Sequence, residues 1–160
     1  MTTLSTPAQI AVPQRRACLV TLAGYPFAVE VRYAREVVVF DEYTVVPLAP
    51  PYLLGVASLR GNIMPVVDVR PLLGMAPAAA GHEVRALVVE RDGVKVGLLI
   101  DEVLGLEALD GPSLADDGHD PGAGHVIAGR LQREGGDVAL LDVRALLTAM
   151  GGDTGEKALA

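Results

Sequence analysis

Residues 55–74 have the sequence GVASLRGNIMPVVDVRPLLG, which carries the clearest structural signal of this chain. Valine and isoleucine recur in it, and β-branched side chains favour a pleated strand over the interior of a helix. Gly55 and Gly61 divide the segment into short pieces, and Asp68 stands where the last apolar piece ends. The pattern predicts short strands that run into one short helix at 70–75.

The end of this segment returns later in the chain. DVRPLL (68–73) and DVRALL (142–147) match at five of six positions, and each follows an apolar strand. Each half of the chain also contains a hairpin of the same kind, GYPFAVEV (24–31) in one and GVKVGLLI (93–100) in the other. These matches indicate two copies of one small β unit. The period is too long and the copy number too low for a solenoid.

The rest of the chain adds strand signals around these copies. They are tight turns at Ala23–Gly24 and Arg91–Gly93, β-branched runs at 35–40 and 44–48, and a second short helix at 143–150. About ten short strands with two short helical pieces predict an all-β barrel or sandwich. We expect two barrel halves, at about 15–75 and 84–150, between polar tails at 1–14 and 151–160.

The composition excludes several classes of protein. Hydrophobic residues make up 51% of the chain, which is too many for a disordered protein. The net charge is −7, and residues 101–120 hold seven acidic residues and no Lys or Arg, so nucleic acid and anionic membranes are poor partners. The sequence has no apolar run of transmembrane length and no secretory signal, so we expect a cytoplasmic protein.

Candidates for chemistry are few. Asp68 and Asp142 each end a strand and start a short helix, and we interpret both as N-caps that accept backbone N–H groups. The Gly-rich segment 110–125 holds Asp and His but lacks the residue order of a calcium loop or a zinc helix. A small metal-dependent enzyme that uses this segment stays an alternative. No nucleophile stands in a catalytic motif, and Cys18 lies in an apolar strand. We therefore predict no catalytic residue, no metal and no cofactor.

Arg60 stands out because its sequence neighbours are apolar on both sides. A guanidinium in such a place must reach water, pair with a carboxylate or contact a partner. Glu36 is the expected mate, and both a structural and a recognition role remain open for Arg60. Gly61 is expected at a tight bend or bulge. Pro65 predicts an edge or bulged strand, because proline cannot donate a hydrogen bond to a neighbouring strand.

Several stretches resemble the CheW-like domain family of bacterial chemotaxis. The first is LVTLAGYPFAVEVRYAREVV (19–38). The second contains the motif G-V-x-x-L-R-G-x-x-x-P-V-x-D, which runs here from Gly55 to Asp68 and is followed by Val69 and Arg70. Further similar segments are ALVVERDGVKVGLLIDEVLGL (86–106) and VALLDVRALL (138–147). The resemblance covers about residues 15–150.

The resemblance implies two five-stranded SH3-like β-barrels packed side by side, with short helices. It also implies a non-catalytic scaffold that couples a CheA-type histidine kinase, through its regulatory domain, to the cytoplasmic helical hairpin of methyl-accepting chemoreceptors. Such a protein does not insert into the membrane but joins receptor arrays at the inner membrane through its partners. Adaptors of related pilus and gliding pathways fit the same pattern. A CheW-like domain detached from a fusion with a receiver or kinase is a further alternative.

By motif, Glu36 and Arg60 match family positions tied to the coupling of receptor and kinase, and Gly55 matches a position that supports the fold. An apolar groove that takes the apolar face of a helix is a known mode of recognition. Four aliphatic residues are expected on the wall of such a groove: Ala34, Val37, Leu59 and Val66. The acidic segment 110–125 has no place in the family's pattern.

Overall fold

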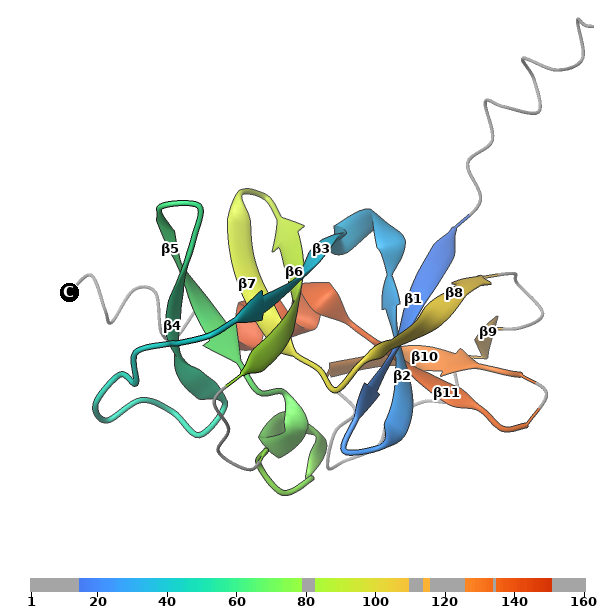
Figure 1. Ribbon diagram of the computed structural model, residues 1–160. Helices are drawn as coiled ribbons and strands as arrows, with labels where there is room; N and C mark the ends of the chain where they lie inside the picture. Colours follow the sequence, from blue (N-terminus) through green and yellow to red (C-terminus); the bar gives the residue numbers. More distant parts are fainter. Residues whose placement is uncertain (1–14, 79–82, 110–113, 116–125, 134, 151–160) are drawn as a thin grey trace, which may run out of the picture.

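The computed structural model describes residues 15–78, 83–109, 114–115, 126–133 and 135–150 (Figure 1). The strands are β1 (Arg16–Leu22), β2 (Tyr25–Glu30), β3 (Ala34–Phe40), β4 (Leu53–Leu59), β5 (Asn62–Val67), β6 (Val84–Arg91), β7 (Val94–Leu99), β8 (Val103–Ala108), β9 (Leu114–Ala115), β10 (Ile127–Leu131) and β11 (Val138–Leu141). The 3-10 turns η2 (Val31–Tyr33) and η3 (Arg70–Leu73) and a helix over 143–150 accompany them. The predicted all-β class is confirmed.

The strands form two sheets that curl into small barrels lying side by side (Figure 1). Barrel A has the strand order β8-β1-β2-β11-β10-β9, and barrel B has the order β3-β6-β7-β5-β4. In barrel B, the segment after β3 reaches the far edge strand through a bridge between Thr44 and Val56. In barrel A, β9 does the same by pairing with β10. In each barrel, the segment that follows one edge strand (β3 in barrel B, β8 in barrel A) pairs at the opposite edge of the sheet and so closes the barrel.

Neither barrel is made from one half of the sequence, which corrects the expected division at 15–75 and 84–150. Barrel A takes the hairpin β1–β2 from the first half and β8 to β11 from the second. Barrel B takes β3 to β5 from the first half and the hairpin β6–β7 from the second. The two copies of the repeat thus exchange their N-terminal hairpins.

The exchange is symmetrical down to the register of the strands. β2 joins β11 in parallel, with Ala28 opposite Leu140, and β7 joins β5 in parallel, with Gly97 opposite Val66. Ala28 and Gly97 occupy the same place in the two hairpins, and Leu140 and Val66 both lie two residues before a DVR motif. The two hairpins have similar sequences, and so do the strands that precede the DVR motifs. The sequence therefore does not show which hairpin pairs with which strand, and only the packed structure does.

Two-residue turns close three of the hairpins. The two central residues have φ values of 53° and 82° at Ala23–Gly24, 51° and 84° at Arg60–Gly61, and 53° and 83° at Asp92–Gly93. These left-handed pairs belong to the type I′ turn, whose twist matches that of the flanking strands. The turns expected at Ala23–Gly24 and Arg91–Gly93 are confirmed, the second with Asp92 and Gly93 as its central residues, and Arg60 is itself a turn residue.

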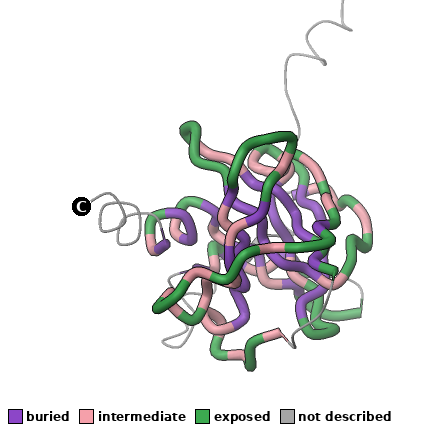
Figure 2. The backbone as a smooth tube through the Cα atoms, turned by 60° about the vertical axis from the view of Figure 1, so that its left-hand side comes forward, coloured by how far each residue is buried: buried purple, intermediate pink, exposed green. Residues whose placement is uncertain are grey.

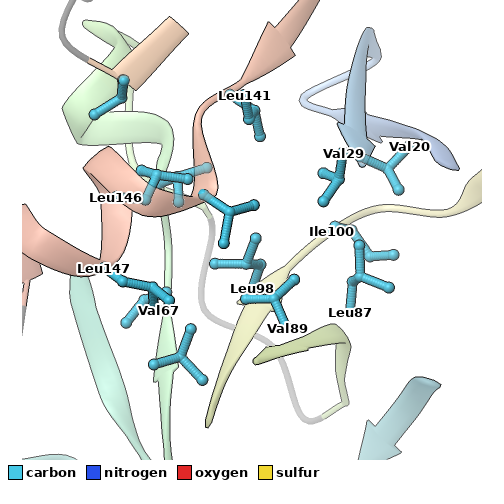
Figure 3. Close-up of a cluster of buried hydrophobic side chains, with 14 of the residues drawn as sticks. Val20, Val29, Val67, Leu87, Val89, Leu98, Ile100, Leu141, Leu146 and Leu147 are labelled. Atoms are coloured by element: carbon cyan, nitrogen blue, oxygen red, sulfur yellow. The ribbon is translucent and has the colours of Figure 1, made fainter. Parts of the chain in front are cut away.

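A large apolar cluster lies between the barrels. Alternate residues of β1 and β6 point into it, while the residues between them fill the barrel interiors. Figure 3 shows side chains from both barrels and from the helix over 143–150 meeting in this cluster, which contains Val20, Val29, Val67, Leu87, Val89, Leu98, Ile100, Leu141, Leu146 and Leu147. The tube in Figure 2 has a buried centre and exposed turns. Full burial of a Val or Leu contributes roughly 1.5–3 kcal/mol, so this shared cluster fastens the barrels together.

The predicted strand at 44–48 is wrong. Apart from the bridge at Thr44, the segment has no strand pairing and ends in a turn at Pro47 and Leu48. Pro47 cannot donate a backbone hydrogen bond, and Leu48 has a left-handed φ of 60°. The β-branched residues of this run therefore lie in a loop.

Of the two alternatives predicted for Pro65, the edge position is wrong, because β5 lies between β7 and β4 in barrel B. The pair of β4 and β5 does contain a bulge, but it lies between Leu53 and Gly55, opposite Val67 and Val66. Val56, opposite Pro65, uses its own N–H and C=O to bond Thr44 at 2.8 Å. Val56 therefore makes no backbone hydrogen bond to Pro65, and an N–H at position 65 would point toward β7 instead. The parallel pairing with β7 begins one residue later, at Val66. An inner strand accepts this proline because no bond is required at that point.

Candidate functional site

The candidate site lies on barrel B, where the turn between β4 and β5 meets β3. Arg60 is the first central residue of the type I′ turn, so its side chain leaves the sheet at the tip of the hairpin and is 65% exposed. Glu36 follows a bulge in β3, where the register shifts between the pairs Ala34–Val89 and Glu36–Val88. A bulge re-aims the side chains next to it. Turn and bulge together bring the two charges into contact.

Arg60 and Glu36 form a bidentate ion pair. Arg60 Nη1 lies 3.1 Å from Glu36 Oε1, and Arg60 Nη2 contacts Glu36 Oε2. This is the mate that the sequence suggested. β3 and β4 are the two edge strands of the sheet, so the pair connects positions that are far apart in strand order. Exposed ion pairs add little stability, and the main effect of this one is to hold the guanidinium in one orientation at the surface.

The ion pair changes the titration of Glu36. Hydrogen bonds from Arg60 lower the pKa of the Glu36 carboxyl, and the charges of Arg60 and Lys95 act in the same direction. A carboxyl whose pKa is lowered by folding stabilises the protein above its ordinary pKa, and this contribution is lost as the pH falls through the lowered value. The pair is therefore fully formed at neutral pH.

We expect Glu36 to titrate below the ordinary glutamate value of about 4.3 in the native protein, and nearer to it in Arg60→Ala. An NMR titration of the side-chain carboxyl carbon measures both values. Glu90, which pairs with Arg35 in both proteins, serves as the internal control. Equal pKa values for Glu36 in the two proteins would contradict the ion pair.

Exposed apolar side chains lie on the same barrel as the ion pair. Val37 and Val39 on β3 are 43% and 47% exposed, and Ile63 on β5 is 77% exposed. A hollow of about 550 Å³ has Val39 and Ile63 among its lining residues. Val45 and Leu48, in the loop between β3 and β4, are exposed as well. An apolar surface with a fixed arginine has the composition typical of protein interfaces.

The four aliphatic residues predicted for a groove wall differ in exposure. Val37 is exposed, whereas Ala34 and Leu59 are half-buried. Val66 is fully buried in the interior of barrel B and cannot line a groove, which corrects that prediction. Side chains alternate along β5, so Met64 and Val66 point inward and Ile63 points outward. Ile63 is an exposed residue that the sequence reasoning missed, because residues 63–67 are apolar throughout and give no phase to the alternation.

Three residues predicted to be structural have clear local roles. Gly55 is buried, and a Cβ there would lie 2.4 Å from the carbonyl oxygen of Thr44. Gly61 has a φ of 84° in the type I′ turn, which glycine adopts without strain. Asp142 Oδ1 accepts a 3.0 Å hydrogen bond from the backbone N–H of Ala145, the geometry of an N-cap.

Asp68 does more than cap a helix. Its Oδ1 accepts the backbone N–H of Arg70 at 3.0 Å, as a cap would, but the N-cap position of η3 is occupied by Val69. The same oxygen lies 3.1 Å from Arg70 Nη1, and Arg70 Nη2 lies 2.6 Å from Asp101 Oδ1. Sequence reasoning missed this buried ionic cluster. The available signals were the DVR motif, in which Arg70 stands, and Asp101, which directly follows an apolar strand.

The described residues give no indication of catalysis. They contain no group of three or more His, Cys, Asp or Glu that could hold a metal ion. The alternative metal segment, 110–125, lies outside the described residues except for β9. Burial raises the pKa of the Cys18 thiol, which disfavours the reactive thiolate. Within the described part of the chain, no helix is long and apolar enough to cross a membrane.

Comparisons with known proteins identify a family for this chain and agree with its fold. The sequence model of the CheW-like domain family matches residues 16–150. A probable chemotaxis protein CheW of Rhizobium etli is 39% identical over 79 residues, which are 48% of this chain and 50% of that protein. PilI of Pseudomonas aeruginosa is 33% identical over 86 residues, 54% of this chain and 48% of PilI, and FrzA of Myxococcus xanthus is 32% identical over 66 residues, 41% of each chain. The matches thus span about half the length of these curated relatives.

A solved structure has the same fold. The crystal structure of the scaffolding protein TtCheW from Thermoanaerobacter tengcongensis superimposes with a TM-score of 0.71. The match covers 81% of this chain and 89% of that one, at 22% sequence identity. At this identity the likeness supports the paired-barrel architecture alone.

Proposed function

The chain belongs to the CheW-like domain family, and from this premise we propose that it is a non-catalytic adaptor that couples a CheA-type histidine kinase to methyl-accepting chemoreceptors. The kinase contributes its regulatory domain and the receptor its cytoplasmic helical hairpin. The observation that carries the proposal is the Arg60–Glu36 pair, which holds a charged group in place on the barrel that also exposes Val37, Val39 and Ile63.

The surface has the physical properties that such coupling needs. Arginines held in one geometry lose less side-chain entropy when a partner binds, and arginine is enriched among the residues that dominate binding energy. Val37, Val39 and Ile63 supply exposed apolar area on the same barrel, and Ile63 lines one hollow together with Arg60. An amphipathic helix, such as the tip of a helical hairpin, lays its apolar face on such a surface.

The proposed setting is the cytoplasm, where the protein joins receptor arrays at the inner membrane through its partners. A net charge of −7 disfavours both nucleic acid and an anionic membrane surface as partners. The proposed function requires neither a metal nor a cofactor.

A second candidate is the corresponding adaptor of a pilus or gliding pathway. The matches to PilI and FrzA, at 33% and 32% identity, favour it, because these values lie within the range of 25% to 39% found for the chemotaxis relatives. Both candidates are scaffolds with a kinase and a receptor as partners. They differ in which kinase and receptor of the same organism bind.

The proposal is tested by calorimetric titration of the full chain into the regulatory domain of each CheA-type kinase of its organism, and into receptor helical hairpins. Saturable one-to-one binding to one kinase and one receptor class supports the adaptor, and the identity of the kinase separates chemotaxis from the pilus and gliding pathways. No binding to any of these kinases or hairpins at tens of micromolar would overturn the proposal.

Arg60→Ala is expected to weaken binding or coupling by about tenfold, because truncation of an arginine that dominates an interface typically costs more than about 1 kcal/mol. The melting temperature should stay close to that of the native protein, since the side chain is exposed. Arg133→Ala is a matched control, because Arg133 pairs with Glu107 on barrel A at 2.9 Å. A large fall in melting temperature for Arg60→Ala would instead give Arg60 a structural role.

A further inference from the structure

We infer that Asp101 is a positioning residue that fixes the angle between barrel A and barrel B. In the described strands the chain passes from one barrel to the other after β2 and again after β7. Asp101 lies at the second crossing, between Leu99, which ends β7, and Val103, which begins β8. A residue at this place can bond to both barrels only while they keep one relative orientation.

Asp101 makes hydrogen bonds to both barrels. Toward barrel A, its Oδ2 accepts the backbone N–H of Gly24 at 2.9 Å, and its own N–H donates to the Thr21 carbonyl at 2.8 Å. Toward barrel B, its Oδ1 accepts Arg70 Nη2 at 2.6 Å, and its carbonyl accepts Arg85 Nη1 at 2.6 Å. The carboxylate therefore bridges the β1–β2 turn of one barrel and a side chain of the other.

The end of this bridge in barrel B is held firmly. Arg70 is only 4% exposed, and its Nη1 lies 3.1 Å from Asp68 Oδ1. Asp68 in turn accepts the backbone N–H of Ala78 at 2.8 Å. Its own N–H donates to the carbonyl of Tyr52 at 2.7 Å. Arg70 thus presents a donor to Asp101 from a fixed place.

Among the described residues, the apolar cluster and the ion pairs at the first crossing set the angle less well. The shared cluster is apolar, and apolar burial has no preferred direction. At the first crossing, Glu30 pairs with Arg15 at 3.0 Å and with Arg32 at 3.1 Å, residues that belong to barrel A and to the crossing itself. Arg35 of barrel B donates to the carbonyl of Arg32 at 3.0 Å, so none of these side chains bonds to both barrels. Charge-assisted hydrogen bonds are short and directional, so the Asp101 carboxylate adds the direction that the apolar cluster lacks.

This inference has a functional consequence that rests on the proposed function. An adaptor that binds two partners at once must hold its surfaces at a constant relative angle. Loss of the Asp101 bridge would then leave each of the two binding surfaces of this protein intact, but it would disturb the complex in which both partners are bound.

The test measures the angle directly through the distance between spin labels on exposed positions of the two barrels, Ser58 and Gln132. We expect one narrow distance distribution in the native protein and a broader one in Asp101→Asn. Gly24 and Arg70 donate to different oxygens of Asp101, and in asparagine one of these two positions is an NH2 group, which cannot accept from the donor that faces it. Glu102→Gln, at the exposed neighbouring residue, is the matched control and should keep the narrow distribution. A native-like distribution in Asp101→Asn would overturn the inference. The chain without added cysteines is the labelling control, and we expect it to take up no spin label because its cysteine, Cys18, is buried.

If Asp101→Asn does not fold, Asp101→Glu takes its place. Its two oxygens lie one methylene farther from the backbone, so the mean distance between the labels is expected to shift, and an unchanged mean would overturn the inference. In a separate arm, binding of each partner alone should stay within about twofold in the variant, while binding of the second partner to the preformed complex falls about tenfold. If the native protein binds neither partner, the proposed function fails, but the distance measurement still decides the role of Asp101.

Discussion

Arg70→Met is expected to lower the free energy of unfolding by about 3–5 kcal/mol, because removing one member of a buried ion pair leaves a buried charge uncompensated. Asp68 is 3% exposed, and its Oδ1 loses the guanidinium that lies 3.1 Å away. Asp101 loses its 2.6 Å contact as well, although its side chain is 38% exposed and water can replace that contact. Most of the loss therefore arises at Asp68.

Urea denaturation followed by circular dichroism measures this effect. Arg144→Met is the matched control, because Arg144 is the exposed counterpart of Arg70 in the second DVR motif. Surface substitutions away from special features usually change stability by less than about 0.5 kcal/mol. If the two variants lost similar amounts, the buried cluster would not be a source of stability.

Gly55→Ala is expected to destabilise the protein by about 1–3 kcal/mol, the range for overpacking a well-packed region. A Cβ at this position would lie 2.4 Å from the Thr44 carbonyl oxygen and 3.0 Å from Tyr43 Cδ2. The closer atom belongs to the backbone, and Thr44 forms the bridge to Val56 that closes barrel B. The methyl group can therefore be accommodated only by moving this bridge.

Thermal and urea unfolding of Gly55→Ala should show this loss, and Ser58→Ala, at an exposed position of the same strand, should not. The double variant with Tyr43→Ala separates the two clashes. Because the Thr44 backbone remains in place, the double variant should be no more stable than Gly55→Ala. A recovery of stability would show that the side chain of Tyr43, and not the backbone, requires glycine at this position.

Much of the candidate site followed from local sequence. Arg60 was identified because a charge stood among apolar residues, and the structure pairs it with Glu36 as expected. The bend next to it was expected from Gly61, since glycine supplies a positive φ without strain, but the left-handed φ of Arg60 itself was not expected. Val66 was placed on the wrong face of β5. The residues around it are all apolar, so the sequence does not show which alternate positions point inward, and a shift by one residue would turn Val66 outward and its neighbours inward.

The sequence marked single members of the ionic cluster of Asp68, Arg70 and Asp101, but it could not show that they meet. Arg70 and Asp101 are 31 residues apart, and the contact forms only where the chain crosses from one barrel to the other. The two DVR motifs look alike, yet Arg70 is buried and Arg144 is exposed. Their difference comes from the surroundings of each copy, not from the motif.

Element types and the internal repeat could be derived from residue order, because β-branched alternation, turn glycines and repeated motifs act over a few neighbouring residues. The same order also contained the motif from Gly55 to Asp68 that resembles the family. It did not contain the pairing between the copies, in which each hairpin joins the other half of the chain. Two similar copies present similar edges, so local preference cannot choose between them. That choice, and the ionic bridge at the crossing, belong to the packed chain, where burial of the cluster shared by the two barrels joins distant segments.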